Sequence, residues 1–207
     1  NKVLFSVPIV SEKVRMLYED RSIKVRHDHV LVAIDPDKRR AVYSTPAGTS
    51  EIDYDYINVI PPMRAPDPVR KSPLAWREGG FAADGWMEVD PATLRHRRFA
   101  NVFGVGDVAG VPKGKTAASV KWQVPVAIDH LIATIKGEKP SLIYTGYTSC
   151  PLITRLGRAM LVEFDYKDNL VPSFPGLIAP LEELWISWVM KTIALKPTYV
   201  AMLRGKA

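Results

Sequence analysis

The stretch NVFGVGDVAG, residues 101–110, decides the fold of this chain. Its apolar residues lead into Gly106 and Asp107, a pattern typical of a strand that ends at the ligand-binding edge of an α/β sheet. Glycine lets the backbone approach a ligand without a Cβ clash, and an ionised Asp beyond the strand can accept a charge-assisted hydrogen bond from a hydroxyl group. A Gly-Asp pair after a strand is also common as a plain turn, so its surroundings must decide between the two interpretations.

The surroundings of this pair extend over GWMEVDPATLRHRRFANVFGVGD, residues 85–107. We predict strands at 86–89 and 101–105, joined by a turn. The spacing in GVGDVAG is not GxGxxG, so this segment is not a phosphate loop. After it, Lys115 and Thr116 begin a long predicted helix that runs to about Lys136, and the first N–H groups of a helix carry partial positive charge.

The only cysteine of the chain, Cys150, lies in GYTSCPLITRLGRAMLVEFDY, residues 146–166, with strands predicted at about 143–149 and 158–165. A single cysteine excludes an internal disulfide framework and any site with several cysteine ligands. A free cysteine is most often a small buried hydrophobic residue. The alternative is a reactive thiol, whose pKa would be lowered by a nearby helix start or by Lys115.

The N-terminal part of the chain predicts one helix followed by several short strands. The apolar run at 2–6 precedes a helix from about Val10 to Tyr18, with apolar residues at helical spacing. Alternating segments that indicate strands lie at 23–27, 29–34, 40–45 and 51–60. The turn-rich TPAGTS at 45–50 predicts a hairpin. Five prolines at 61–75 exclude a helix interior or a central strand and indicate a linker.

The tail from Leu181 predicts two helices with a break near Lys196 and Pro197. Its first helix carries an apolar stripe that includes Trp185 and Trp188. The window 177–195 contains three charged residues and a proline, so we reject a transmembrane span, which needs about 20 predominantly apolar residues. An amphipathic helix in a membrane interface and a helix packed on its own domain both fit this pattern.

The overall composition is that of an ordinary globular protein, with 47% hydrophobic and 24% charged residues. The formal net charge is +6, but the basic residues are scattered, which favours a solvated basic surface and leaves an anionic membrane surface as a partner. No aromatic-interleaved basic motif indicates nucleic-acid binding. The four histidines show no shared metal-ligand spacing, so we predict no metal site.

These motifs resemble the sulfide:quinone oxidoreductases, in the subgroup that includes the mitochondrial enzymes. The resemblance covers 1–75, 85–166 and the C-terminal LRGK, and corresponds to the C-terminal portion of such proteins. It implies an α/β fold, an incomplete two-dinucleotide-binding-domain flavoprotein of the Rossmann-like FAD/NAD(P) type, with a β-meander and C-terminal amphipathic helices. The implied domains are 1–65, the second half of an NAD(P)-type domain; 66–84, a linker; 85–175, part of the FAD domain; and 176–207, the helical tail.

The resemblance also implies roles for individual residues. FAD would be bound by Gly106, Asp107, Lys115 and Thr116, with the helix start and Lys115 stabilising the reduced flavin. Cys150 would be one member of a redox pair: sulfide opens a sulfur bridge, one cysteine holds the sulfur as a persulfide, and the other thiolate reduces the flavin, which then reduces ubiquinone or menaquinone. The residues proposed for the quinone site are Ile153, Phe164, Phe174 and Trp185.

The expected setting is a peripheral position on a respiratory membrane, held through the C-terminal helices; association with further copies of the chain is compatible with the sequence. The partner cysteine and the ADP-binding half lie outside this chain, so we expect the chain alone to be inactive and to lack FAD. Two alternatives stay open: a type II NADH:quinone oxidoreductase, and a non-catalytic membrane-docking or oligomerisation module of the same fold.

Overall fold

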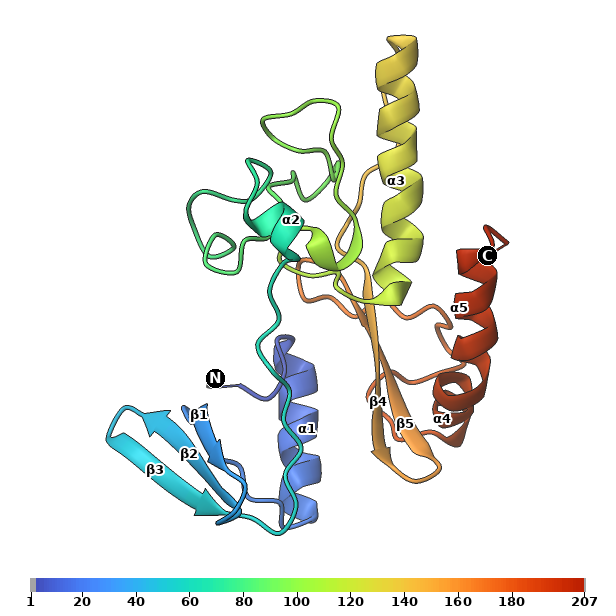
Figure 1. Cartoon of the computed structure of the whole chain (residues 1–207). Helices are drawn as coiled ribbons and strands as arrows, with labels where there is room; N and C mark the ends of the chain where they lie inside the picture. The colour runs from blue at the N-terminus through green and yellow to red at the C-terminus, as the bar shows by residue number, and fades with distance from the viewer. Residues whose placement is uncertain (1–2, 207) are drawn as a thin grey trace. The chain divides into compact units, whose positions relative to one another are not determined.

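The computed structural model describes residues 3–206, which divide between Pro62 and Met63 into two compact units (Figure 1). The apolar run predicted at 2–6 begins outside the described residues. Each unit has its own secondary structure: a helix and a three-stranded sheet in the first, and the long helix, a two-stranded sheet and the helical tail in the second. The structure is therefore mixed α/β with small sheets, as expected at that level of detail; a Rossmann-like arrangement stays a prediction.

The first unit contains helix α1 (Pro8–Asp20) and an antiparallel meander of β1 (Val30–Asp35), β2 (Arg40–Thr45) and β3 (Gly48–Asp53). Pro8 occupies the first turn of α1, where its missing N–H removes no helical hydrogen bond. The β2–β3 turn is tight because Gly48 has φ +114° and Thr45 Oγ1 donates to the Gly48 carbonyl. The helix, the meander and the hairpin predicted at 45–50 are confirmed.

Two strand predictions in the first unit were wrong. Residues 23–27 form no strand, and the strand predicted at 51–60 ends at Asp53. In both segments the residue types alternate as they do in strands. A ladder also needs a partner on at least one edge. Asp53 is the last residue of β3 opposite a β2 residue, Arg40, so the pairing ends there.

The second unit begins with the proline-rich segment, which contains only the short helix α2 (Asp67–Arg70). Its hydrophobic core is formed mainly by side chains of the segment 86–111. The core residues are Met87, Val89, Leu94, Ala109, Val111, Val126 and Tyr144. The strands predicted at 86–89 and 101–105 are not formed. Their residues make isolated bridges, including a parallel one between Met87 and Ala109. Within residues 3–206 these bridges do not extend into a ladder.

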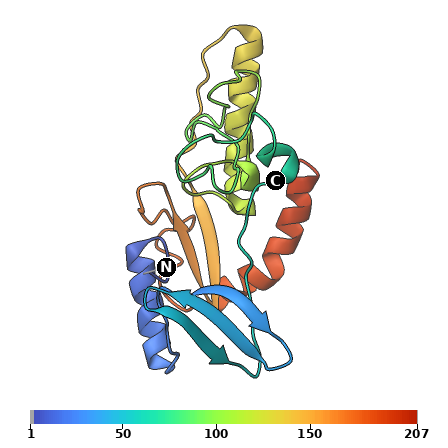
Figure 2. The ribbon, with the colours of Figure 1, turned by 60° about the vertical axis from the view of Figure 1, so that its left-hand side comes forward.

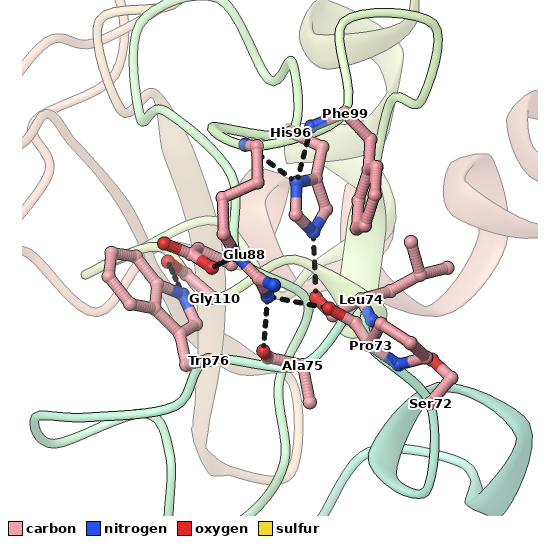
Figure 3. A network of polar contacts seen from close by, with 10 residues as sticks. Ser72, Pro73, Leu74, Ala75, Trp76, Glu88, His96, Phe99 and Gly110 are labelled. Atoms are coloured by element: carbon pink, nitrogen blue, oxygen red, sulfur yellow. Dashed lines mark hydrogen bonds and ion pairs between the residues drawn. The ribbon is translucent and has the colours of Figure 1, made fainter.

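A polar network holds the linker against this core (Figure 3). His96 is 2% exposed; its Nδ1 accepts the backbone N–H groups of Arg98 and Phe99 at 3.0 and 3.2 Å, and Nε2 donates to the Leu74 carbonyl at 3.1 Å. Because Nδ1 is an acceptor, the proton lies on Nε2. Arg98 joins Glu88 to the carbonyls of residues 73 and 75, so this turn fixes the chain that enters the unit.

The long helix α3 (Ala117–Lys136) begins at the Thr116 cap and ends at Gly137, which has φ +71°. Capping residues of these types explain why the predicted boundaries are confirmed. The chain then returns along α3, an arrangement visible in both views (Figures 1 and 2). The carboxylate of Asp129 accepts the N–H groups of Ser141 and Leu142, which attaches the returning segment to the helix.

The antiparallel hairpin of β4 (Thr148–Arg155) and β5 (Arg158–Phe164) follows. The second predicted strand is confirmed, whereas the first starts later than the 143–149 expected. Residues 142–144 instead run beside α3, and His130 Nε2 of that helix lies 2.9 Å from the Leu142 carbonyl oxygen. Cys150 therefore lies within β4, opposite Val162 of β5, and not in the loop after a strand.

The tail forms α4 (Trp185–Val189), the π-helical turn η2 (Met190–Ala194) and α5 (Leu195–Leu203). The break was predicted near Lys196 and Pro197, but the irregular part of the tail is η2, which comes before them. Pro197 itself lies in the first turn of α5. Proline has no N–H, and its ring clashes with the carbonyl four residues earlier in a regular helix, so a π-turn at this point accommodates it. Leu184 lies before the helix and bridges Ala159 of β5.

Candidate functional site

The Gly-Asp turn at 106–108 is a short 3-10 helix, η1 (Gly106–Val108), anchored on α3. Gly106 has φ +70°, and its N–H donates to the buried Oε1 of Gln123 at 2.6 Å. Gln123 Nε2 donates to the Gly114 carbonyl at 3.0 Å. One buried amide therefore fixes both ends of the loop that carries the predicted cofactor-binding residues. Sequence reasoning missed Gln123, although a polar residue on the apolar face of the predicted helix was a signal.

Lys115 closes this loop upon itself. Its Nζ donates to the carbonyls of Asp107 and Ala109 at 2.6 and 2.7 Å and lies 3.6 Å from the centre of the Trp86 ring. Burial lowers the pKa of Lys115 to about 8, and the negative charges of Asp107 and Asp84 oppose that shift. The ammonium group thus neutralises the turn that contains Asp107. Its contact with a flavin stays a prediction.

Thr116 has a structural task that the sequence did not single out. Its Oγ1 accepts the Ser119 N–H at 3.2 Å and thereby caps α3. Ala117, the first residue of the helix, is exposed, and so is Asp107. An exposed carboxylate and an accessible helix N-terminus in one loop are the groups needed for polyol hydroxyls and for negative charge, respectively. These residues fit the flavin end of FAD.

Cys150 is half-buried in β4, and the charged group that acts on its thiol is Lys191 of η2. Burial raises the pKa of the Cys150 thiol, while Lys191 opposes the rise. The cation expected beside this cysteine was Lys115. Ser187, four residues before Lys191, is completely buried, so the side of α4 shared by Ser187 and Lys191 faces the hairpin. No sequence spacing could have revealed this pairing between two distant elements.

A buried carboxylate lies on the other face of the same hairpin. Glu163, 3% exposed, accepts hydrogen bonds from the Tyr147 hydroxyl and from both the N–H and the hydroxyl of Ser173. It pairs with Ser149 across the ladder, so it points away from the face that carries Cys150. Burial and the adjacent Glu163 raise the pKa of Tyr147 to about 12. This cluster anchors the segment after β5 to the hairpin.

The four residues predicted for a quinone site are not brought into one pocket. Phe164 is buried on the Cys150 face of the hairpin, with the Lys113 ammonium 5.3 Å from its ring centre, whereas Ile153 lies on the opposite face. Phe174 lies in the loop after β5. Trp185 lines a cavity at the hairpin tip with residues 155–158. The quinone assignment stays a prediction.

Among residues 3–206, no cluster of three or more His, Cys, Asp or Glu side chains could hold a metal ion. Within the same part of the chain, no helix combines the length and the apolar character that crossing a bilayer requires.

Comparison with known proteins gives a consistent group of relatives, although no family model matches the chain. The mitochondrial sulfide:quinone oxidoreductase of Mus musculus is 37% identical over 175 residues, which is 83% of this chain and 38% of the relative. That of Dictyostelium discoideum is 36% identical over 204 residues, or 98% and 44%. That of Schizosaccharomyces pombe is 34% identical over 175 residues, or 83% and 37%.

The chain is homologous to the C-terminal portion of the sulfide:quinone oxidoreductases. This confirms the resemblance inferred from the Gly-Asp and cysteine motifs. The chain spans about two fifths of the length of these sulfide:quinone oxidoreductases. A chain in the cryo-EM structure of the Tetrahymena thermophila mitochondrial ATP synthase shares the fold, with a TM-score of 0.74 and 24% identity over 91% of this chain and 45% of that one.

Proposed function

We propose that this chain is the C-terminal part of an FAD-dependent sulfide:quinone oxidoreductase. The observation that carries the proposal is the similarity of the chain, over 83–98% of its length, to sulfide:quinone oxidoreductases from three organisms. The only cysteine of the chain lies in a strand, where burial raises the pKa of its thiol and the positive charge of Lys191 opposes that rise. The longer protein oxidises sulfide and reduces ubiquinone or menaquinone.

Cys150 is one of two redox cysteines in this proposal, and the other lies outside the chain. Hydrosulfide attacks the Sγ atom of one cysteine in the disulfide between the two; the S–S bond breaks, that cysteine carries the new sulfur as a persulfide, and the other cysteine leaves as a thiolate. The thiolate, and not the thiol, is the reactive species. Lys191 favours that form electrostatically, against the cost of burial.

FAD, when bound, supplies the two-electron carrier between the cysteine pair and the quinone. Within this chain its flavin end would be held by Gly106, Asp107 and the start of α3, with Asp107 accepting a hydroxyl hydrogen bond and Thr116 keeping the helix N-terminus ordered. Gln123 positions this loop, and Lys115 balances its charge. The ADP-binding half is contributed by the remainder of the longer protein, so the chain alone purifies without FAD.

The quinone enters from a membrane surface. The tail presents Trp185, Ile193, Leu195 and Leu203 as exposed apolar side chains, together with the exposed Lys196. Amphipathic helices of this composition lie in the plane of the interface. The three relatives are named as mitochondrial, and we place this protein peripherally on a respiratory membrane.

The test is sulfide-dependent quinone reduction by the longer protein, with Cys150→Ser compared with the wild type. We expect activity in the wild type, its loss in Cys150→Ser, and unchanged FAD absorbance in both. Ser149→Ala, on the opposite face of β4, is the matched control and should stay active. NADH-dependent quinone reduction that does not depend on sulfide and is unchanged in Cys150→Ser would instead identify the protein as a type II NADH:quinone oxidoreductase.

A further inference from the structure

The β4–β5 hairpin ends in an apolar side chain that nothing covers in the described part of the chain. Leu156 is 92% exposed, and the turn is possible because Gly157 has φ +74°. Arg155 and Arg158 pair across the hairpin on either side of this turn. A leucine with this exposure contributes almost nothing to the stability of its unit, because an apolar side chain stabilises a fold only when it is buried.

The start of the tail lies beside this tip. The backbones of Ala159 and Leu184 exchange both hydrogen bonds, at 3.1 and 2.9 Å, so the residue that follows, Trp185, is brought next to the turn. Trp185 and residues 155–158 line an open cavity of about 360 Å³. Trp185 is 57% exposed. The hairpin tip and the start of α4 therefore form one surface, which we call the tip surface: Arg155, Leu156, Gly157, Arg158 and Trp185.

The chemistry of the tip surface is that of a lipid interface. A guanidinium group presents several donors in a plane and matches the oxygens of a phosphate, and two arginines here line one cavity. Tryptophan is enriched where an apolar phase meets water, with its ring in the apolar part and its N–H near the headgroups. A protruding leucine between two cations would enter the acyl region while the cations stay at the phosphates.

The neighbouring residues extend the same pattern. Ile153 and Ile186 are 53% and 45% exposed, and the exposed face of α5 continues with Leu195, Tyr199 and Leu203. Exposed lysines and an arginine accompany them at 196, 204 and 206. A protein partner would call for a broad apolar patch with few charges at its centre. The tip surface has one projecting apolar residue between positive charges, which favours an anionic bilayer.

We propose that the tip surface binds membranes that contain anionic phospholipids, with Leu156 and Trp185 inserted among the lipids and Arg155 and Arg158 on the headgroup phosphates. The hairpin that carries Cys150 is then a membrane anchor in addition to the tail helices, which extends the membrane position given under the proposed function. This inference does not use the redox chemistry proposed above, and it can hold or fail independently of it.

The experiment places a fluorophore at the tip of this chain. In a Cys150→Ser background, Leu156→Cys provides a single thiol for an environment-sensitive dye. We expect its emission to shift to shorter wavelength with vesicles of phosphatidylcholine and phosphatidylglycerol and to change little with phosphatidylcholine alone. At high salt the emission should return to the wavelength of the lipid-free sample. Ile135→Cys, at a 76% exposed apolar position on α3, is the matched control and should show no shift.

Co-sedimentation of the unlabelled chain with the same vesicles gives a second readout. Replacing one arginine near an anionic surface should weaken partitioning about fivefold, so Arg155→Ser with Arg158→Ser should lose about 25-fold. Lys136→Ser with Lys139→Ser, which removes the same charge elsewhere, should lose much less. Leu156→Asp should lose about tenfold or more.

Three results would overturn the proposal. The first is a dye at position 156 that does not respond to anionic vesicles, together with unchanged co-sedimentation of the arginine double variant. The second is a response to inorganic phosphate equal to that to vesicles, which would indicate a soluble anion site. The third is a shift that depends on protein concentration without lipid, which would indicate contact between copies of the chain.

Discussion

The N–H of Gly106 donates to the Oε1 atom of Gln123 across 2.6 Å of protein interior, and this bond joins the Gly-Asp turn to the middle of α3. The same side chain reaches the Gly114 carbonyl with its Nε2 atom. Two segments that would otherwise be free loops are thereby held at a fixed distance from one helix. The geometry of the predicted flavin-binding loop thus depends on a residue that need not touch a cofactor.

Gln123→Leu should destabilise the second unit by about 2–4 kcal/mol, because it leaves a buried N–H and a buried carbonyl without partners. Urea unfolding followed by tryptophan fluorescence measures this directly, since every tryptophan lies after residue 62. Lys121→Ala, at an exposed position two residues earlier, should change stability by less than about 0.5 kcal/mol. Equal effects of the two substitutions would contradict the role given to Gln123.

Lys115 should make the second unit more stable as the pH rises above 8. Its pKa is about 8 in the folded chain, lowered by burial, and near 10.5 when unfolded, so between these values the unfolded chain binds more protons and the free energy of unfolding increases with pH. After allowance for solvent screening, the increase should be on the order of 1–2 kcal/mol. Below pH 8 both states are protonated and the contribution is constant.

The measurement for Lys115 is the difference between wild type and Lys115→Met in urea unfolding at pH 7.5, 9 and 10. Subtraction removes the other lysines and tyrosines that titrate in this range. The wild type should gain stability relative to the variant as the pH rises. A constant difference would show that the ammonium group is not buried against Trp86 and the loop carbonyls.

Protonation of His96 should lower the stability of the second unit at acidic pH. Burial lowers the pKa of His96, and a protonated Nδ1 can no longer accept the N–H groups of Arg98 and Phe99. The folded state therefore binds the proton less tightly than the unfolded chain, and stability falls as the pH drops below about 6.5. We expect a loss of stability between pH 7.5 and 5 that His96→Gln, already destabilised at pH 7.5, does not show.

The elements that sequence predicted well are those whose determinants are local. Helix α3 has a Thr cap, apolar residues at helical spacing and a glycine in the left-handed region at its end, and all three act within the helix itself. The meander depends on turn residues and on alternation within neighbouring strands. The motif around Cys150 was informative for a different reason: the residue types matched a known family, whose relationship the comparisons confirm.

The predictions that were wrong concern features that depend on contacts between segments distant in the sequence. In the segments 86–89 and 101–105 ladder formation depends on a neighbouring strand, and only isolated bridges form within residues 3–206. The position of the irregular turn in the tail depends on how the helix accommodates Pro197 several residues later. The influence of Lys191 on the thiol of Cys150 depends on how the tail folds back on the hairpin, which leaves no spacing signal in the sequence.

Lys191 should keep the Cys150 thiol more acidic than its burial alone would allow. Burial raises the pKa of the thiol and Lys191 opposes this, so Lys191→Met should shift the pH profile of alkylation further upward and slow the reaction severalfold at pH 8. Because Cys150 is the only cysteine, iodoacetamide labelling of the chain followed by mass spectrometry reports this thiol alone. Lys191→Arg should restore the profile, and Lys196→Met, in the same tail, should leave it unchanged. A profile that is identical in Lys191→Met and wild type would mean that the cation does not reach the sulfur and that Cys150 is controlled by burial alone.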